Sequence, residues 1–137
     1  MPLDPVRVED TREWIAKSRK DLQRAKRLLS ESDYDLEDGL FHCQQAAEKA
    51  LKAFLTWHDR PFAKTHDLRH LSRECAAIDR AFERFIDRLE DVTPYAWVFR
   101  YPSDEPQPTL AQANSAVALA CEVVEGVLAR LPDELHS

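Results

Sequence analysis

Hydrophobic positions recur with helical spacing along almost the whole chain. A first helix is predicted over residues 11–30, opened by a capping-box-like pair of Asp10 and Glu13. One face of this helix is basic, with six cations between residues 17 and 27 against one acidic residue, Asp21. The opposite face is expected to face the core and consists of Trp14, Ile15, Ser18, Leu22, Ala25 and Leu29.

The second predicted helix begins at residue 35 or 36 and ends at residue 59, because Pro61 disfavours helical geometry at Arg60. Its apolar arc is wide, which is typical of a helix covered on most sides, so we expect it at the centre of a bundle. Small residues in this arc allow a neighbouring helix to approach closely. They are Ala46, Ala47, Ala50 and Ala53.

Three more helices are predicted in the second half of the chain. A short one covers residues 68–78, and another starts after Asp79. The last helix starts with a capping box of Thr109 and Gln112 and should end near Pro132. Inward-facing positions of the helix after Asp79 are Phe82, Phe85, Ile86, Leu89 and Val92.

The composition agrees with a helical domain. The chain of 137 residues has only two glycines, with 44% hydrophobic and 32% charged residues, a balance that excludes intrinsic disorder. We predict a single domain over residues 1–137, an all-α antiparallel (up-and-down) bundle of four long helices plus a short helix. No apolar run is long enough to cross a bilayer, and no secretory signal is evident, so a cytoplasmic protein is expected.

The cysteines and the overall charge exclude several kinds of site. Cys43, Cys75 and Cys121 are far apart and form no CxxC pair, so we interpret them as small buried hydrophobes. No metal site and no cofactor are predicted, since no histidines or carboxylates combine at a convincing ligand spacing. The net charge of −6 argues against general polyanion binding. We interpret the basic face of the first helix as solvent-exposed; an RNA track there is a weaker alternative, because no aromatic residues are interleaved for base stacking.

A polar strip runs along the second predicted helix. His42, Gln45, Lys49 and Lys52 follow the i, i+3, i+7, i+10 pattern of one helical face, and Glu48 is spaced to pair with Lys52. Gln44 and Glu48 extend the strip on its other flank. Such a row of donors can receive a phosphate or a nucleotide. From spacing alone, the solvated side of an amphipathic helix is the favoured interpretation.

The loop at residues 64–68 (KTHDL) leads into the next helix start. Free backbone N–H groups there favour an anion, and Lys64 or His66 would add positive charge. The simpler interpretation is also the better supported one. In it, Thr65 and Asp67 cap the helix and His66 is a half-buried hydrogen-bonding partner.

Taken in order, these segments resemble the HEPN domain family (higher eukaryotes and prokaryotes nucleotide-binding), in its prokaryotic stand-alone form. The resemblance rests on Asp21-Leu-x-x-Ala, residues 41–52 (FHCQQAAEKALK), residues 64–68, Tyr95-Ala and residues 100–102 (RYP). It implies a helical bundle, commonly a homodimer. It also implies a minimal nucleotidyltransferase partner in a toxin–antitoxin-like module.

Many members of this family are metal-independent endoribonucleases with an Arg-x(4–6)-His motif near the last long helix. Arg100 stands where that arginine is expected, but residues 101–108 contain no histidine. Arg60 to His66 and Arg130 to His136 match the bare spacing, which shows how unspecific it is. The missing histidine favours a non-catalytic member; if the protein is a ribonuclease, Arg100 with His66 or His42 would act across a dimer interface.

The leading hypothesis is therefore a non-catalytic, dimeric module that binds nucleotide or RNA phosphate. The lysines and Arg100 would meet phosphate, Gln45 would hydrogen-bond the base or ribose, and His66 would donate to a phosphate oxygen. Two alternatives stay open: an endoribonuclease toxin, and a protein-interaction scaffold favoured by exposed aromatics beside the second helix. The nucleotide or RNA and the partner protein are not identified by the sequence. The predicted ligand-binding residues are Gln45, Lys49, Lys52, Lys64, His66 and Arg100.

Overall fold

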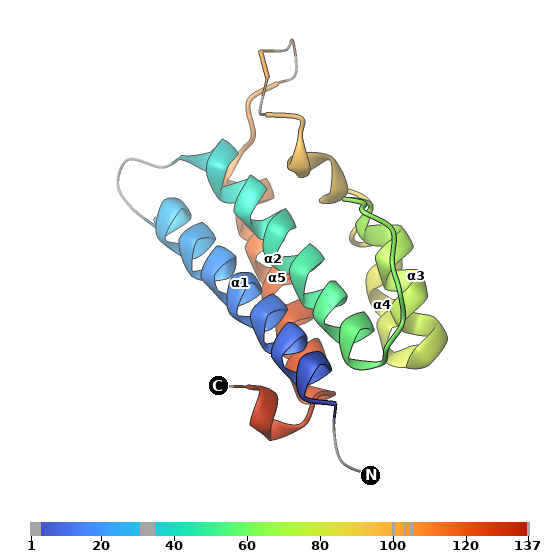
Figure 1. The fold of residues 1–137 in the computed structure, drawn as a ribbon. Coiled ribbons are helices and arrows are strands. Elements are labelled where there is room, and N and C mark those ends of the chain that lie inside the picture. The colour runs from blue at the N-terminus through green and yellow to red at the C-terminus, as the bar shows by residue number, and fades with distance from the viewer. Residues whose placement is uncertain (1–3, 31–34, 100, 103, 105, 137) are drawn as a thin grey trace.

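The computed structural model describes residues 4–30, 35–99, 101–102, 104 and 106–136, and every regular element within them is helical (Figure 1). The predicted all-α bundle is therefore confirmed. The α-helices are α1 (Pro5–Ser30), α2 (Leu36–Trp57), α3 (Leu68–Ile78), α4 (Glu83–Ile86) and α5 (Leu110–Ala129). Three short 3-10 turns accompany them: η1 (Arg80–Phe82), η2 (Thr93–Ala96) and η3 (Asp133–Leu135).

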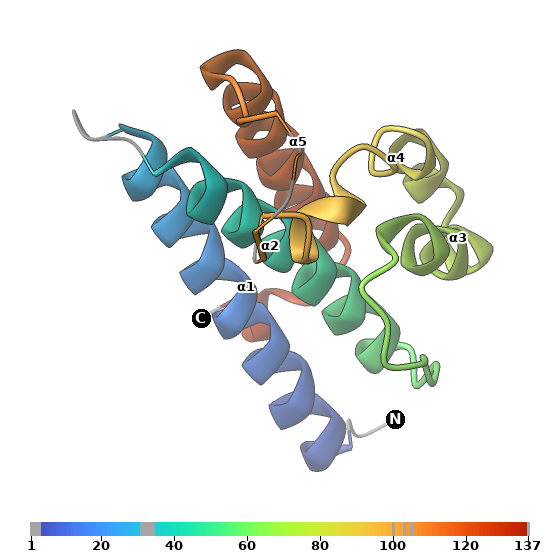
Figure 2. The same ribbon diagram turned by 90° about the horizontal axis from the view of Figure 1, so that it is seen from above.

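Helix α2 is at the centre of the bundle, as its wide apolar arc predicts. It contacts α1, α3, α5 and η2, and in Figure 2 it lies between α1 on one side and α3 on the other. Helix α1 runs antiparallel to α2, while α5 runs in the same direction as α2 (Figure 1). The segment between α2 and α5 returns the chain to the end of the bundle where α2 began.

Small residues let α1 and α2 pack closely along their length. All four alanines of the predicted arc are buried. The hydroxyl of Ser18 in α1, itself buried, donates to the carbonyl of Ala46 in α2 at 2.7 Å. Cys43 and Cys75 are buried as expected, whereas Cys121 is only partly buried; all three are free thiols.

Three predicted helix starts are confirmed by their capping hydrogen bonds. Asp35 caps α2 by accepting from the backbone of Asp38, and Asp67 caps α3. Thr109 and Gln112 form the full capping box of α5, with both reciprocal hydrogen bonds present.

The predicted start of the first helix is wrong by six residues. Helix α1 begins at Pro5, a residue whose fixed φ suits the first helical position. The carboxylate of Asp4 accepts from the backbone N–H of Val6, so capping occurs one turn and a half upstream of the predicted pair. Asp10 and Glu13 are exposed residues inside the helix.

The predicted end of α2 at residue 59 is also wrong. The helix ends at Trp57, and Asp59 has a positive φ of 53°. The backbone N–H of Arg60 then donates to the carbonyl of Leu55 at 2.8 Å, which satisfies one of the helix's terminal carbonyls.

The helix expected after Asp79 is broken into η1, the four-residue α4 and a series of turns. Several of its hydrogen bonds span three residues, including Val92 N–H to the carbonyl of Leu89, and these tighten the backbone. Phe82, Phe85, Leu89 and Val92 are nevertheless buried, whereas Ile86 is only partly buried. The apolar spacing is therefore a correct prediction of burial at four of the five positions and a wrong prediction of a continuous helix.

Candidate functional site

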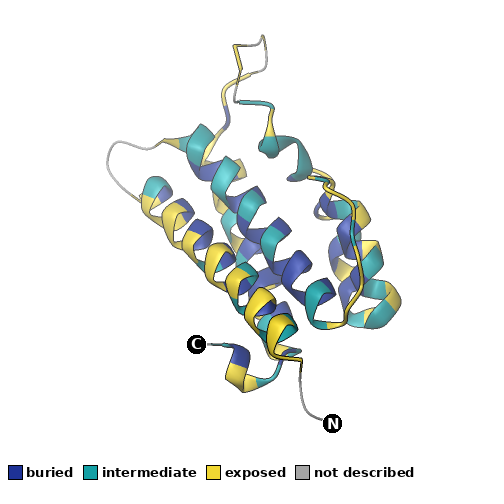
Figure 3. Cartoon of the chain, viewed as in Figure 1, coloured by how far each residue is buried: buried dark blue, intermediate teal, exposed yellow. Residues whose placement is uncertain are grey.

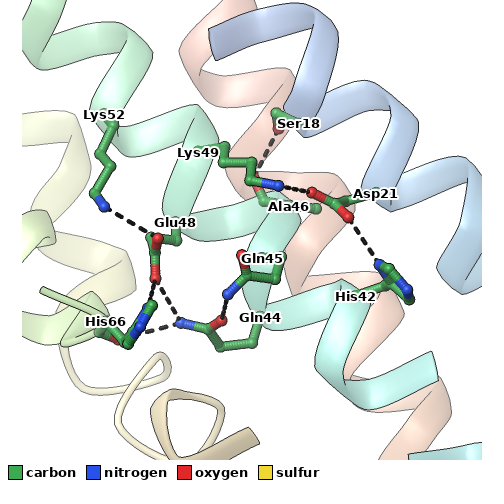
Figure 4. Close-up of polar contacts among 10 residues, drawn as sticks. All are labelled: Ser18, Asp21, His42, Gln44, Gln45, Ala46, Glu48, Lys49, Lys52 and His66. Carbon is green, nitrogen blue, oxygen red and sulfur yellow. Dashed lines mark hydrogen bonds and ion pairs between the residues drawn. The ribbon is translucent and has the colours of Figure 1, made fainter. Parts of the chain in front are cut away.

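Two carboxylates organise a group of polar side chains at the face of α2 (Figure 4). Asp21 projects from α1, and Glu48 projects from the middle of α2. Each carboxylate contacts one imidazole and one lysine ammonium. We call the whole set the polar cluster; its members are Asp21, His42, Gln44, Gln45, Glu48, Lys49, Lys52 and His66.

Glu48 is the more deeply buried of the two acids, with 5% of its side chain exposed. Its Oε1 accepts from Nε2 of Gln44 at 3.1 Å and lies 2.7 Å from Nδ1 of His66. Its Oε2 accepts from Nζ of Lys52 at 3.1 Å. Gln44 also donates to the backbone carbonyl of His66 at 3.1 Å, so the loop before α3 is tied to α2 by two neighbouring side chains.

Asp21 forms the second half of the cluster, between α1 and α2. Its Oδ1 lies 2.7 Å from Nδ1 of His42, and its Oδ2 accepts from Nζ of Lys49 at 2.5 Å. The other ring nitrogen of His42 is 3.8 Å from a carboxylate oxygen of Asp38. Both nitrogens of His42 therefore face carboxylates, and only 16% of the side chain is exposed.

Lys52 is held between aromatic rings as well as by Glu48. Its Nζ is 5.5 Å from the ring centre of Trp14 and 5.6 Å from that of Phe62. Cation–π attraction adds to the ion pair at this distance. With 9% of its side chain exposed, Lys52 packs as part of the interior while its charge is compensated.

The polar strip predicted along α2 exists, but it is not the solvated face that spacing favours. Gln44, Glu48 and Lys52 are buried, because the loop after α2 and the N-terminal half of α1 cover them. The predicted pair of Glu48 and Lys52 is confirmed. Both lysines of this strip, Lys49 and Lys52, are already paired with acids, so a phosphate would compete with those acids for them.

The helix start after the loop follows the simpler interpretation. The carboxylate of Asp67 accepts from the backbone N–H groups of Arg69 and His70, and the hydroxyl of Thr93 accepts from that of Leu68. The hydroxyl of Thr65 accepts from the backbone of Asp67. These amides are occupied, so the proposal of free N–H groups at the start of α3 is wrong.

Among the acids, lysines and histidines of the polar cluster, His66 has the most exposed side chain. Its side chain is 60% exposed, although Nδ1 is bonded to a buried carboxylate. The expectation of a half-buried ring is therefore wrong. Gln45 is partly buried and donates to Oε1 of Gln44 at 2.7 Å. Lys64 is exposed, and within the described residues its ammonium forms no hydrogen bond or ion pair.

The remaining arginines of the predicted motifs differ in their surroundings. Arg100 lies outside the described residues. Arg130 is bonded to Asp79 and to the carbonyl of Gly126, and His136 lies 3.1 Å from the carbonyl of Leu131, which are structural contacts. Arg60 pairs with Glu74 at 3.8 Å rather than with His66.

Neither Asp21 nor Glu48 is among the predicted ligand-binding residues, although both centre the cluster. A signal for each is present in the sequence. Asp21 is the one acid within the basic face of the first helix, and Glu48 precedes Lys52 by one turn. The contact between Glu48 and His66 joins residues 18 positions apart, and local spacing carries no signal for it.

The cluster offers an exposed imidazole edge at His66, and Lys64, two residues earlier, is exposed and has no ion-pair partner within the described residues. No group of three or more potential metal-ligating side chains occurs within the part of the chain that the structure describes. A cavity of about 650 Å³ lies elsewhere, between the segment at residues 88–95 and α5, and no cluster residue lines it. No described helix has the length and apolar character required to span a membrane.

Comparison with models of known protein families gives a match. The family model described as HEPN domain matches residues 11–130, a range that includes the entire polar cluster. No curated protein and no solved structure matches the chain significantly. The resemblance carried by residues 41–52 and 64–68 is thereby confirmed.

Proposed function

The chain belongs to the HEPN domain family, and from this premise we propose that it is a non-catalytic module that binds the phosphate of a nucleotide or RNA. The proposed contacts are His66 and Lys64, with Gln45 and Lys49 at the accessible edge of the polar cluster. Arg100 remains a predicted contact from the sequence. Lys52 serves a different role, because it is buried and neutralises Glu48.

The observation that carries this proposal is the anchoring of His66. A histidine that is 60% exposed would ordinarily be free to rotate, but Nδ1 is 2.7 Å from Glu48 and the His66 carbonyl accepts from Gln44. These contacts hold the ring with Nε2 on its solvent side. In the protonated ring both nitrogens are donors, so Nδ1–H donates to Glu48 while Nε2–H is available to a phosphate oxygen.

Lys64 adds a positive charge for which no acidic side chain of the described residues competes. It precedes His66 by two residues in the same loop, is exposed, and has no ion-pair partner within the described residues. Lys49 is 22% exposed and is shared with Asp21, which reduces what it can give to a ligand. We therefore expect His66 and Lys64 to contribute more to phosphate affinity than Lys49.

The test is the binding of mononucleotides and a short RNA by His66→Ala. A ligand that binds only the folded state raises the melting temperature by mass action, so a thermal-shift panel identifies it and calorimetry gives its affinity. His70→Ala is the matched control, since His70 is exposed and lies in the first turn of α3. Equal affinity of both variants would contradict the assignment of His66.

The same proposal includes partners. We propose a homodimer that pairs with a minimal nucleotidyltransferase in a toxin–antitoxin-like system. Exposed apolar side chains support a contact surface at the end of the bundle where α5 begins: Trp97 is 49%, Tyr101 75% and Leu110 41% exposed. Light scattering would test the dimer by comparing the molar mass of Trp97→Ser with that of the wild-type protein. A dimeric mass in both would show that the dimer does not depend on Trp97.

A second candidate, metal-independent RNA cleavage, is favoured by one observation. Glu48 orients His66 through Nδ1, which leaves Nε2 of the neutral ring as a proton acceptor for a 2′-hydroxyl. His42 is less suited, because both of its nitrogens face carboxylates. Cleavage of RNA in the presence of EDTA that His66→Ala abolishes would favour this candidate over simple binding.

A further inference from the structure

A row of cations on the outer side of α1 takes no part in the polar cluster. Lys17, Lys20, Arg24 and Arg27 are all exposed and follow the i, i+3, i+7, i+10 pattern, so they share one face of the helix. At 1.5 Å per residue this row is about 15 Å long. Figure 3 shows the outer side of α1 as a band of exposed residues, opposite its buried face. We call these four residues the basic stripe.

The four cations of the basic stripe have no acidic partner within the described residues, in contrast to half of the other basic residues that the structure describes. Within the described residues, none of the four side chains forms a hydrogen bond or an ion pair. Elsewhere, both lysines of α2 are paired with carboxylates. The same is true of five arginines outside α1: Arg60, Arg69, Arg80, Arg88 and Arg130.

The stripe is also a local exception to the charge of the chain. Residues 17–27 contain six of the 19 basic residues but only one of the 25 acidic residues. That acid, Asp21, is already bonded to His42 and Lys49. A polyanion approaching this otherwise acidic molecule is therefore attracted to one face and repelled by much of the remaining surface, which orients it.

We propose that the basic stripe binds the sugar–phosphate backbone of RNA and extends the phosphate site along α1. The choice of RNA over an acidic protein rests on the function proposed above. Lys17 and Arg24 lie one turn before and after Asp21, whose partners belong to the polar cluster, so the stripe and the cluster are neighbours. No aromatic residue is interleaved with the four cations, so the contacts go to phosphate and are independent of base sequence.

The experiment compares Arg24→Glu with Arg73→Glu, an exposed arginine of α3 that serves as the matched control. Fluorescence anisotropy with a labelled oligouridylate is measured over a salt series, and calorimetry with a mononucleotide runs in parallel. Arg24→Glu is expected to weaken RNA binding at least tenfold at low salt. It should also reduce the slope of log affinity against log salt by about 0.7 or more, the value for one phosphate contact on a single strand. Mononucleotide affinity and the control should be unchanged.

The outcomes separate this proposal from the function of the polar cluster. If Arg24→Glu binds RNA as tightly as Arg73→Glu, or if the wild-type protein binds no RNA, the stripe proposal is overturned. Displacement of RNA by an acidic protein then becomes the next test for this face. If RNA binding depends on Arg24 while no mononucleotide binds and His66→Ala has no effect, the stripe stands and the phosphate site at His66 fails.

Discussion

Replacing Lys52 by methionine is expected to lower the free energy of unfolding by about 3 kcal/mol, the lower end of the cost of breaking a buried ion pair. Methionine keeps the aliphatic contact with Trp14 and Phe62 but removes the charge. Glu48, with 5% of its side chain exposed, then loses one of its three donors in a place that water hardly reaches. The lower end of the range of costs applies because Gln44 and His66 still form hydrogen bonds with the Glu48 carboxylate.

Lys49→Met is the matched control for this prediction. Lys49 is also paired with a carboxylate, but it is 22% exposed, so water can replace the lost contact and the cost should be about 1 kcal/mol. Urea denaturation followed by circular dichroism measures both variants, and equal m-values show that the midpoints report stability. Similar losses for the two lysines would refute the argument that burial determines the cost.

The double variant Lys52→Met/Glu48→Gln separates the pair from the packing. An amide at Glu48 can still accept from His66 and carries no charge that needs a partner. The two substitutions together should therefore cost less than the sum of the single losses, by about 1–3 kcal/mol. Simple additivity would mean that the two groups do not interact appreciably in solution.

Gly126→Ala should raise the free energy of unfolding by about 1 kcal/mol, because alanine favours helix and the added Cβ would meet its nearest atoms at 3.5 Å, an ordinary contact distance. Thermal unfolding measures this change, and a loss of stability would show a steric clash. A disulfide reagent at pH 8 should label Cys121 first, because burial raises the pKa of the Cys43 thiol to about 12 and that of Cys75 further, so neither forms thiolate until the protein unfolds. Rapid labelling of all three thiols in the native state would contradict this. Arg100→Lys should weaken nucleotide or RNA binding, since lysine lacks the bidentate contact of arginine with phosphate; unchanged affinity in calorimetry would count against a role for Arg100.

Much of the candidate site follows from local spacing along α2. The polar strip and the pair of Glu48 with Lys52 depend on residues three or four positions apart, which a helix brings together whatever surrounds it. Spacing gives no information on what covers that strip. The burial of Gln44 and Lys52 depends on Trp14 from α1 and on the loop after α2, and both are distant in the sequence.

The sequence by itself determined the helical class, the central place of α2 and most helix starts, because periodicity and capping are properties of neighbouring residues. It did not determine where the segment after Asp79 departs from a regular helix, since tighter turns bury the same apolar positions. Only the tertiary structure decided how Asp21 is compensated and that His66 contacts Glu48. Asp21 meets His42 and Lys49 because α2 packs beside α1, and His66 reaches Glu48 from the loop before α3, whereas Lys20 and Arg24 stay exposed because no described element packs against that side of α1.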